Sequence, residues 1–509
     1  MPPPKPMSPP KLVTPIRRYE ELDGAQGREV FFRPQRYRAQ DVLPLRAFVR
    51  LRVDLAIHEC AVHDVSQNGV AFEWPQAVPL EAGRNVERLE VCFDDHVAYH
   101  GDARVGSVRG QEGAPIAGVS FTGPLLDIDV VLHLRDIKAW QGRDGLGLTL
   151  SRKAWAVEGH EKFKMLVSEL ALYLQDSELQ LGELEKSLAW HVVQGESQSA
   201  AREALLDRLR SEFVIDVVRY SDAINAALEG VPPAHVKNLR EYTRRLLHDY
   251  IMQAPWMQRA YFKPFGYPGD YEVMRFIYER DFEGATLFGK ALGYAFLQTK
   301  AALAVKFRKD LIKRELRARL EAHRGIERPL RILSVASGPA QELYELLREL
   351  PGEVPPLEIM LFDQDKGALS YAYRRLKPMV EERFKGDVQI LYLHDSIKRL
   401  LRDSDLFSGF GHFDAIYSCG LFDYLQTTTA VVLARNLYAR LAPGGTLSVG
   451  NMAPENPSRW FMEHHLDWVL IHRTRAQLTE IATRGAPDSH LRIIEEESGV
   501  NPFIVMTRQ

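Results

Sequence analysis

The chain has 509 residues, of which 45% are hydrophobic and 26% are charged. These proportions are typical of a globular protein, and the length predicts about three domains of roughly 150 residues each. The formal net charge of −3 argues against a general nucleic-acid or membrane-surface function. No apolar run reaches the ~18 residues of a membrane span, and the three cysteines are too few for a disulfide framework or a zinc site. We therefore expect a cytoplasmic protein with neither a nucleic-acid partner nor a resident metal.

Residues 1–28 begin MPPPKPMSPPKLVTP and contain prolines and charges without any periodicity. They lack the hydrophobic core of a signal peptide. Because proline-rich, unpatterned segments do not build a packed core, this stretch is predicted to be a disordered leader.

Short β-like runs follow in residues 29–145. Apolar residues that alternate with polar ones, separated by Gly, Asp and Pro turns, predict strands at 47–53, 57–65, 69–74, 86–93, 97–108 and 116–121. Six short strands in this order predict a small antiparallel β-barrel or sandwich.

A polar turn separates the second and third of these strands. It reads DVSQNG from Asp64 to Gly69 and matches DxSxxG. With the strand pattern around it, the region resembles the PilZ domain, a small β-barrel family that binds the messenger cyclic di-GMP. The resemblance implies ligand contacts from Asp64, Ser66 and Gly69, since polar side chains can bond a guanine edge or a sugar-phosphate and glycine permits a tight turn. The alternative is an ordinary turn.

The PilZ family also carries an RxxxR pair before its first strand, where guanidinium forks suit phosphates and guanine edges. The literal match here is Arg46 and Arg50. Together with Arg52, these residues alternate with apolar neighbours on one strand face, which favours a solvated face instead. Arg36 and Arg38, in the arm FFRPQRYRAQ, are better placed although their spacing departs from the family pattern. They are the candidate arginines for cyclic di-GMP.

Residues 150–324 have the periodicity of amphipathic helices. Helices are expected at 163–190, 202–228 and 236–250, with breaks at 195–199 and at Gly230. Helix pairs of this kind more often mediate packing or dimerisation than chemistry. A homodimer through the helical region is therefore one interpretation.

An aromatic-rich segment, YFKPFGYPGDY, occupies residues 261–271. Its prolines and glycines exclude a helix, and its rings suggest a lid or a pocket wall. A packed interdomain loop is the alternative. Tyr267, Asp270 and Tyr271 are the candidate lid residues.

Strands and helices alternate from residue 325 to the C-terminus. The first unit has an apolar run, a small-residue turn at 336–340, a helical pattern and a second apolar run that ends on Asp363. Nucleoside cofactors bind such βαβ units, because small residues let the backbone approach the ligand and a carboxylate accepts the ribose hydroxyls.

Further strands are predicted after this unit, with a sharp turn at the PGG of 443–445. Parallel strands with crossover helices and a reversed final strand describe a doubly wound α/β domain. The remaining expected strands are 388–395, 413–420, 446–449 and a final antiparallel pair at 492–496 and 503–507.

This order of features resembles the class I S-adenosylmethionine-dependent methyltransferases over residues 325–509. A dinucleotide is disfavoured as the cofactor because GxGxxG is absent. The resemblance implies contacts to S-adenosyl-L-methionine from the ends of the first four strands, namely Ser337, Gly338, Pro339, Asp363, Gln364, Asp395, Ser396 and Ser418.

The sequence departs from the family's glycine loop, [D/E]xGxGxG. The matching positions hold Ser334, Ala336, Gly338 and Ala340, so only the central glycine remains. Alanine permits the turn if φ stays negative. Because Ser334 replaces the acid that meets the cofactor's amino group, that contact must come from elsewhere or through water.

Five motifs resemble a narrower group, the bacterial extracellular-factor or 3-hydroxypalmitate methyl ester synthases. The resemblance implies carboxyl methylation of a 3-hydroxy fatty acid. The motifs are KPFGYPGDYEVM (263–274), SGPAQE (337–342), FDQD (362–365), GLFDYL (420–425) and NPSRWFMEHHLDW (456–468).

Candidate acceptor-site residues follow the fourth and fifth strands, at the edge where such folds bind ligands. Tyr424, Arg459 and His464 are the candidate catalytic residues, and Asn451 is a candidate substrate contact. Arg459 could pair with an acceptor carboxylate or cap the NPSR turn. A carboxylate acceptor is ionised at neutral pH and needs no base, whereas an amine acceptor would need one. Two alternatives stay open: an N-methyltransferase, and a cyclic di-GMP receptor with a decayed methyltransferase scaffold.

Overall fold

The computed structural model describes residues 20–21, 36–53, 56–75, 81, 83–109, 115–123, 125–141, 159–187, 203–384 and 386–509. The chain forms two compact units. The sheet unit comprises Met1–Glu29, Ala304–Pro454 and Ile471–Gln509, and the barrel–helix unit comprises Val30–Leu303 and Glu455–Leu470. None of the described helices has the length and apolar character that a membrane crossing requires.

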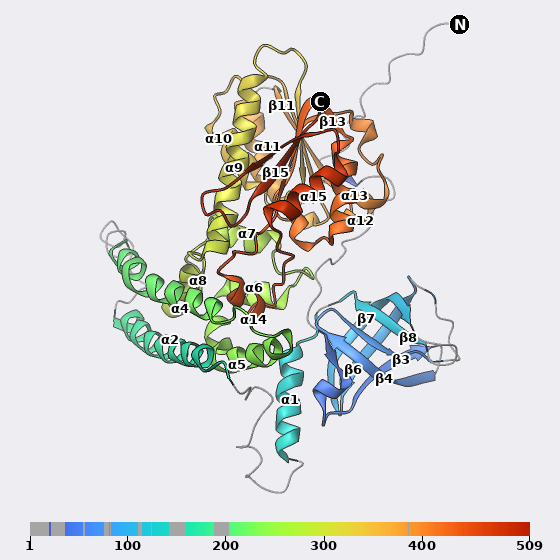
Figure 1. Ribbon diagram of the computed structural model, residues 1–509, viewed down its shortest axis with the longest axis vertical. Helices are drawn as coiled ribbons and strands as arrows, with labels where there is room; N and C mark the ends of the chain where they lie inside the picture. The colour runs from blue at the N-terminus through green and yellow to red at the C-terminus, as the bar shows by residue number, and fades with distance from the viewer. Residues whose placement is uncertain are drawn as a thin grey trace. The chain divides into compact units, whose positions relative to one another are not determined.

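The predicted β-barrel is confirmed in the barrel–helix unit. Its strands are antiparallel, and the barrel closes because β4 pairs with both β3 and β5. The short β2 adds to the outer side of β4. The elements are β2 (Tyr37–Arg38), the 3-10 turn η1 (Ala39–Val42), β3 (Ala47–Val53), β4 (Ala56–Ser66), β5 (Gly69–Glu73), β6 (Asn85–Phe93), β7 (His96–Arg109), β8 (Ile116–Phe121) and α1 (Ile128–Gln141) (Figure 1).

Alternation of side chains along these strands fills the barrel. Val49, Val91 and Val119 belong to one buried cluster that spans the strands. The outward face of β3 carries the predicted solvated arginines, and Arg46 and Arg50 both pair with the exposed Glu59.

Helices make up the rest of the barrel–helix unit. Gly230 has a positive φ, and Pro233 opens α5 as its first helical residue, so the break predicted there is confirmed. The break predicted at 195–199 lies outside the described residues. The helices are α2 (Glu161–Ser187), the π-turn η3 (Leu209–Phe213), α4 (Val214–Ala226), α5 (Pro233–Ile251), α6 (Pro255–Phe262), α7 (Tyr271–Tyr278), α8 (Leu287–Phe296) and α14 (Arg459–His464).

The aromatic segment at 261–271 is more helical than predicted. Tyr261 and Phe262 end α6, and Tyr271 begins α7. The expectation that proline and glycine exclude a helix is therefore correct only for the intervening loop. Pro255 is the first residue of α6. A backbone N–H at this position has no hydrogen-bond acceptor within the helix, so proline, which lacks the N–H, is tolerated there.

The sheet unit has the predicted doubly wound topology. Its strand order is β1-β11-β10-β9-β12-β13-β15-β14, and β15 runs antiparallel to both of its neighbours. The order in which successive strands join the sheet reverses between the parallel strands β9 and β12, which is the switch point where such sheets bind ligands. The strands are β1 (Glu20–Glu21), β9 (Leu330–Val335), β10 (Leu357–Asp363), β11 (Val388–His394), β12 (Phe413–Ser418), β13 (Leu441–Gly450), β14 (His490–Ile494) and β15 (Phe503–Thr507).

One strand prediction needs correction, and one strand was not predicted. Glu20 and Glu21, within the segment predicted to be a leader, pair with β11 as β1. The predicted sharp turn at 443–445 lies inside β13, where the register to β12 slips between Phe413 and Ala415. An irregularity within a strand accommodates such a PGG segment without ending it.

Helices cover both faces of the sheet (Figure 1). Leucines of α9, α10 and α11 share one buried cluster with β9, β10 and β11, and α13 packs against α15 and α12 on the other side. These helices are α9 (Lys300–Ala322), α10 (Gln341–Glu349), α11 (Lys366–Arg383), α12 (Ile397–Arg402), α13 (Thr427–Tyr438) and α15 (Arg475–Gly485). The short turns η4 (Ser408–Phe410) and η5 (Phe422–Tyr424) flank β12.

Candidate active site

The loop between β9 and α10 is built from left-handed backbone. Ala336, Gly338 and Ala340 have φ of 56°, 53° and 51°. The condition that alanine keep a negative φ is therefore not met, and each alanine carries a strain of about 1–2 kcal/mol. Strain of this kind persists where the surrounding structure holds it and is typical of ligand sites. The loop thus keeps a glycine-type conformation without the glycines.

Asp363, at the end of β10, fastens this loop. Its Oδ2 accepts the N–H of Gly338 at 2.8 Å, and its Oδ1 accepts the N–H of Asp365 at 2.8 Å. No heavy atom lies within 4 Å of the position where a Cβ of Gly338 would stand. Two predicted cofactor residues are thus in direct contact, beside open space at the edge of the sheet.

The predicted cofactor residues of β11 and β12 reach the same edge. The N–H of Asp395 donates to the carbonyl of Asp363 at 3.4 Å. The carboxylate of Asp395 accepts the N–H of Ser396 at 2.7 Å and pairs with Arg399 at 2.7 Å. Ser418 donates its hydroxyl to the carbonyl of Val335 at 3.0 Å. Asp395 is held by its own neighbours, so its contact to a cofactor stays a prediction.

Buried polar atoms without partners point to a ligand at this edge. Within the described residues, Ser337 Oγ and Asp365 Oδ2 are buried and make no hydrogen bond. Buried polar groups that lack a protein partner often meet a ligand or water. Pro339 and Gln364 flank these atoms in the sequence. A nucleoside with hydroxyl and amino groups fits this set of acceptors and donors.

A buried carboxyl that the sequence reasoning missed lies next to the loop. Glu342, in the first turn of α10, accepts the Tyr417 hydroxyl at 2.6 Å. Burial raises the pKa of Glu342, opposed by the hydrogen bond from Tyr417. Tyr417 lies opposite Ser334, the residue that replaces the expected acid, in the pairing of β12 with β9. Glu342 is thus a buried acid that contacts Tyr417, the neighbour of Ser334. In the sequence its only signal was its place at the end of the SGPAQE motif.

A second missed residue is Arg308 of α9. Its guanidinium lies against the backbone after β12, where a Cβ on Gly420 would meet Nη2 at 3.0 Å. Nη1 donates to Oδ1 of Asn501 at 3.2 Å. A side chain at position 420 would require the guanidinium of Arg308 to shift by a few tenths of an ångström. A buried cation thus lies beside the carboxyl end of β12.

The segment after Gly420 is held by another buried arginine. Arg473 donates to the carbonyl of Phe422 at 2.8 Å and to Asn451 Oδ1 at 2.6 Å, and it also bonds the carbonyl of Leu425. The amide nitrogen of Asn451 donates to the carbonyl of Ile471 at 2.9 Å. Asn451 is fully buried and helps to hold this segment through its bonds to Arg473 and Ile471. Its predicted contact to the substrate stays a prediction.

Asp423 lies within the same segment and was also missed. Its Oδ1 accepts the N–H of Met452 at 2.7 Å. Burial raises the pKa of Asp423 to about 6, opposed by that hydrogen bond and by the charges of Arg308 and Arg473. A carboxyl with a pKa near neutrality can accept or give a proton under physiological conditions. Its neighbour Tyr424, the predicted catalytic residue, is half-buried in η5.

The other two predicted catalytic residues belong to the barrel–helix unit. Arg459 pairs with Glu463 at 2.7 Å and is half-exposed, so it does not cap the NPSR turn through its side chain. His464 is buried with Nδ1 3.3 Å from the hydroxyl of Thr243. Burial lowers the pKa of His464 well below its usual range, aided by Arg240, so the ring is neutral.

The predicted lid residues lie around the start of α7. Asp270 caps this helix by accepting the N–H groups of Glu272 and Val273 at 3.0 Å each, and Arg259 bonds both of its oxygens at 2.9 Å. Tyr271 follows as the first helical residue and stacks on Phe265. Asp270 therefore has a clear structural task.

Tyr267 is half-buried in the same loop. The loop begins with Lys263, which is fully buried and donates to Gln67 Oε1 at 2.8 Å and to the carbonyl of Tyr261 at 2.9 Å. Gln67 belongs to the DxSxxG turn of the barrel. This part of the segment is packed against the barrel, as the interdomain-loop alternative requires.

The predicted cyclic di-GMP residues gather beside β2. The side chain of Arg36 forms an ion pair with Asp64. Arg38 lies opposite Asp64 only through the backbone, in the pairing of β2 with β4. Ser66 is buried and donates to Asn68 Oδ1 at 2.9 Å, and Gly69 starts β5. Arg38 is exposed. The barrel thus brings together one candidate arginine and the aspartate of the turn.

No protein-family model matches the chain, and no curated protein matches it either. Solved structures resemble it at low identity. A possible exported protein from Bordetella parapertussis is 17% identical, with a TM-score of 0.40, covering 58% of this chain and 96% of that one. Magnesium protoporphyrin IX methyltransferase from Synechocystis PCC 6803, with bound SAH, is 14% identical, with a TM-score of 0.34 and coverage of 50% and 98%.

A further neighbour is the N-methyltransferase NodS from Bradyrhizobium japonicum WM9, in complex with S-adenosyl-L-homocysteine. It is 15% identical, with a TM-score of 0.25, and covers 38% of this chain and 86% of that one. An O-methyltransferase family protein from Burkholderia thailandensis has 15% identity, a TM-score of 0.28 and coverage of 55% and 74%.

Proposed function

We propose that the chain is an S-adenosylmethionine-dependent methyltransferase that methylates the carboxyl group of a small acid. The observation that supports this best is the left-handed loop after β9, whose Gly338 N–H is bound by Asp363 at the end of the adjacent strand. Ser337 Oγ and Asp365 Oδ2 would add polar contacts there. When bound, the cofactor supplies an electrophilic methyl group on sulfonium.

The chain's own residues would position the reactants, since methyl transfer by in-line displacement depends mainly on proximity and orientation. Asp363 would hold the ribose hydroxyls. Arg308, fixed beside Gly420, offers a buried guanidinium to a carboxylate, and Tyr424 lies on the segment that follows. A carboxylate acceptor requires no proton transfer, so these residues need only bind and orient it.

An amine acceptor is the second candidate, and Asp423 favours it. Its pKa of about 6 suits a group that removes a proton from an amine at neutral pH. The decayed-scaffold alternative is less well supported. Ala336 and Ala340 keep the strained left-handed conformation, which a loop released from ligand binding would have no reason to retain.

Isothermal titration with S-adenosyl-L-homocysteine tests the cofactor. We expect wild type to bind it and to ignore NAD⁺. Asp363→Ala should weaken binding about a hundredfold, because a charge-assisted pair of hydrogen bonds contributes about 3 kcal/mol. Asp387→Ala, an exposed aspartate before β11, should bind normally. Absence of binding by wild type to either S-adenosylmethionine or its product would disprove the proposal.

The acceptor class follows from the stability of the product. The protein is incubated with methyl-labelled cofactor and a cell extract, and the labelled product is then treated with mild base. An ester releases its label as volatile methanol, whereas an N-methyl group keeps it. Label that stays on the product after base treatment would mean that the acceptor is an amine and would contradict carboxyl methylation.

We further propose that the barrel is a PilZ-like regulatory domain that binds cyclic di-GMP. Arg36, held by Asp64 at the turn, would bond a phosphate or a guanine edge. Equilibrium dialysis should give binding by wild type, loss in Arg36→Ala, and no change in Arg46→Ala on the exposed strand face. A ligand that binds without altering cofactor affinity or turnover would refute the regulatory part alone.

A homodimer through the helical region is also proposed. Along α2, Met165, Leu172 and Leu179 recur every seven residues and are each more than half exposed. Apolar residues at this spacing form the seam of paired helices. Light scattering should give twice the monomer mass for wild type and the monomer mass for Leu172→Glu. A monomeric wild type at tens of micromolar would contradict this.

A further inference from the structure

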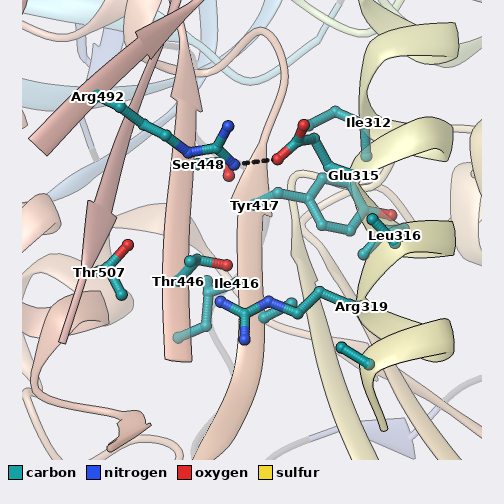
Figure 2. Close-up of a pocket in the computed structure, with 13 residues that line it drawn as sticks. Ile312, Glu315, Leu316, Arg319, Ile416, Tyr417, Thr446, Ser448, Arg492 and Thr507 are labelled. Atoms are coloured by element: carbon teal, nitrogen blue, oxygen red, sulfur yellow. Dashed lines mark hydrogen bonds and ion pairs between the residues drawn. The ribbon is translucent and has the colours of Figure 1, made fainter. Parts of the chain in front are cut away.

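A groove of about 310 Å³ lies on the face of the sheet beneath α9, within the sheet unit (Figure 2). Its floor is formed by β12, β13, β14 and β15, and its other wall by one side of α9. The helix residues that line it begin at Ile312. They come after Arg308, which lies against Gly420, so the groove is distinct from the loop edge.

One cation in this groove lacks a partner. Figure 2 shows Arg319 reaching from α9 across the groove toward Thr446 and Ile416. Among the described residues its guanidinium forms no hydrogen bond or ion pair. Burial lowers the pKa of Arg319, which the nearby Asp414 opposes. A guanidinium that is partly desolvated without a direct ion pair is costly for the protein alone, so an anionic ligand would relieve that cost.

The charges of the groove indicate how much negative charge it can take. Arg492 forms an ion pair with Glu315 across the opening. The ionised groups of the lining are therefore two guanidinium groups and one carboxylate, which leaves one positive charge, that of Arg319. A monoanion neutralises this charge, whereas a phosphate dianion would exceed it.

The remaining lining indicates the rest of the ligand. Thr446, Ser448 and Thr507 bring hydroxyl groups to the floor, while Ile312, Leu316 and Ile416 are apolar. The volume lies at the lower end of small-molecule sites, about 300–1,000 Å³. A short hydrocarbon part fits the apolar side, and a planar anionic group fits the guanidinium fork.

We propose that this groove is a second ligand site, which binds a small aliphatic carboxylic acid as its carboxylate through Arg319. The site does not depend on methyl transfer, and its test reads binding alone. Tyr417 forms part of its floor and also bonds Glu342 beside the loop between β9 and α10, so both sites share one side chain.

Ligand-detected NMR titration with hexanoate tests the proposal on the full chain. Wild type should bind hexanoate saturably, and the neutral hexanamide should not compete. Arg319→Gln should lower the affinity about ten- to hundredfold, the amount expected for a charge-assisted bond. Arg314→Gln removes an exposed arginine of the same helix and should leave the affinity within about twofold of wild type.

Thermal unfolding without ligand provides an independent measurement. Because the Arg319 charge is desolvated and unpaired, Arg319→Gln should melt at or above the temperature of wild type. A clear drop would mean that the guanidinium has a structural partner and would overturn the proposal. So would equal hexanoate affinity in Arg319→Gln, no saturable binding by wild type, or Arg319-dependent binding of inorganic phosphate in preference to hexanoate.

Discussion

Glu342 and Glu345 lie about one turn apart on α10 and have opposite electrostatic environments. Burial raises the pKa of Glu342, which bonds the Tyr417 hydroxyl. Burial also opposes ionisation of Glu345, but hydrogen bonds from Lys309 and Gln341 outweigh it and lower the pKa of Glu345. One helix therefore presents a poorly compensated acid to the loop edge and a well-compensated acid to its flank.

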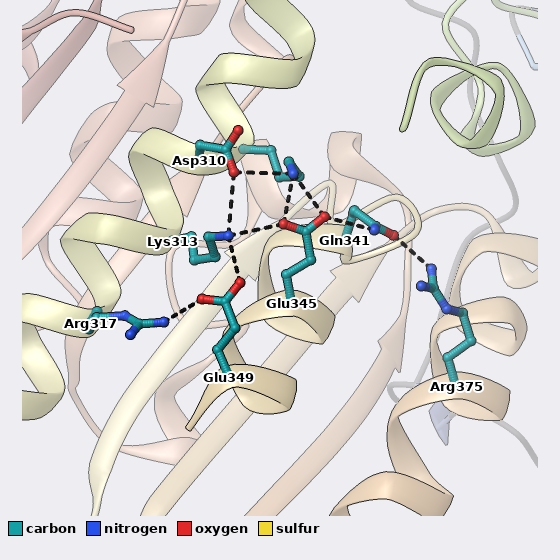
Figure 3. A network of polar contacts seen from close by, with 8 residues as sticks. Asp310, Lys313, Arg317, Gln341, Glu345, Glu349 and Arg375 are labelled. Carbon is teal, nitrogen blue, oxygen red and sulfur yellow. Dashed lines mark hydrogen bonds and ion pairs between the residues drawn. The ribbon is translucent and has the colours of Figure 1, made fainter. Parts of the chain in front are cut away.

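The flank network is extensive (Figure 3). Lys309 and Lys313 of α9 pair with Glu345 at 2.7 and 3.1 Å, and Lys313 also pairs with Glu349 at 2.9 Å. Gln341 extends the network to Arg375 of α11 at 2.7 Å. These partners bind α9, α10 and α11 together. The ion pairs around Glu345 on the flank therefore stabilise the fold. The buried carboxyl of Glu342 at the loop edge lacks such compensation, as is typical of a ligand site.

The largest effect should come from removing the buried arginine that holds the edge segment. Arg473→Met leaves the carbonyls of Phe422 and Leu425 and the amide oxygen of Asn451 without their donor. Each buried acceptor left unpaired costs about 1–3 kcal/mol, so urea unfolding should show a loss of at least about 3 kcal/mol. The exposed Arg475→Met should lose less than about 0.5 kcal/mol. Equal losses in both variants would mean that the buried hydrogen bonds of Arg473 contribute no more to the free energy of unfolding than the exposed contacts of Arg475 do.

Asp423→Asn should remove a pH dependence. Its folded pKa of about 6 lies above the ordinary 3.8, so the folded state retains the proton longer than the unfolded state does. The free energy of unfolding of wild type should then fall as pH rises through the range from about 4 to 6, by about 3 kcal/mol in total at about 1.4 kcal/mol per pKa unit.

Asparagine keeps the acceptor for Met452 but cannot ionise, so the variant should lack this fall and become more stable than wild type above pH 6. Chemical unfolding at half-unit pH intervals measures the difference. Asp387→Asn, exposed before β11, should keep the wild-type slope. A parallel pH profile for Asp423→Asn and wild type would show that this edge holds no strained carboxyl.

Much of this comparison follows from sequence patterns whose physics is local. Apolar runs predicted the strands, and the ends of consecutive parallel strands necessarily meet at one edge, which brings Gly338 to Asp363. The antiparallel C-terminal pair was equally readable, because β14 and β15 are short and separated by a turn.

The charges at that edge were not predictable in the same way. Arg308 reaches Gly420 from a distant helix, and the burial of Glu342 and Asp423 depends on packing that no spacing reveals. The prediction for alanine failed because it followed the preference of alanine for negative φ, whereas Ala336 and Ala340 are left-handed on either side of Gly338, whose N–H is bound by Asp363. Glu342 and Asp423 stood inside quoted motifs, but their residue type alone did not separate them from solvated acids.

Glu345→Gln should show a dependence of opposite sign to that of Asp423. The folded pKa of Glu345 is lowered, so its stabilisation is present above the ordinary value of about 4.5 and is lost as pH falls below it. At pH 7 the variant should be less stable by about 1 kcal/mol, a figure reduced for partial exposure. The deficit should shrink toward pH 3 and in 1 M NaCl. A deficit that persists at pH 3 would mean that packing rather than charge is responsible.

The smallest effect is expected at the outer end of the same network. Arg317 pairs with Glu349, but their side chains are 43% and 38% exposed, so water and salt screen the pair and side-chain ordering offsets its gain. Arg317→Gln should therefore change the free energy of unfolding by less than about 0.5 kcal/mol, against about 1 kcal/mol for Glu345→Gln. Because the two sites lie on the same helix pair, any general loosening of α9 from α10 would affect both variants alike. A loss from Arg317→Gln as large as that from Glu345→Gln would mean that the flank acts as one cooperative network, and that the exposure of a single pair does not set its contribution.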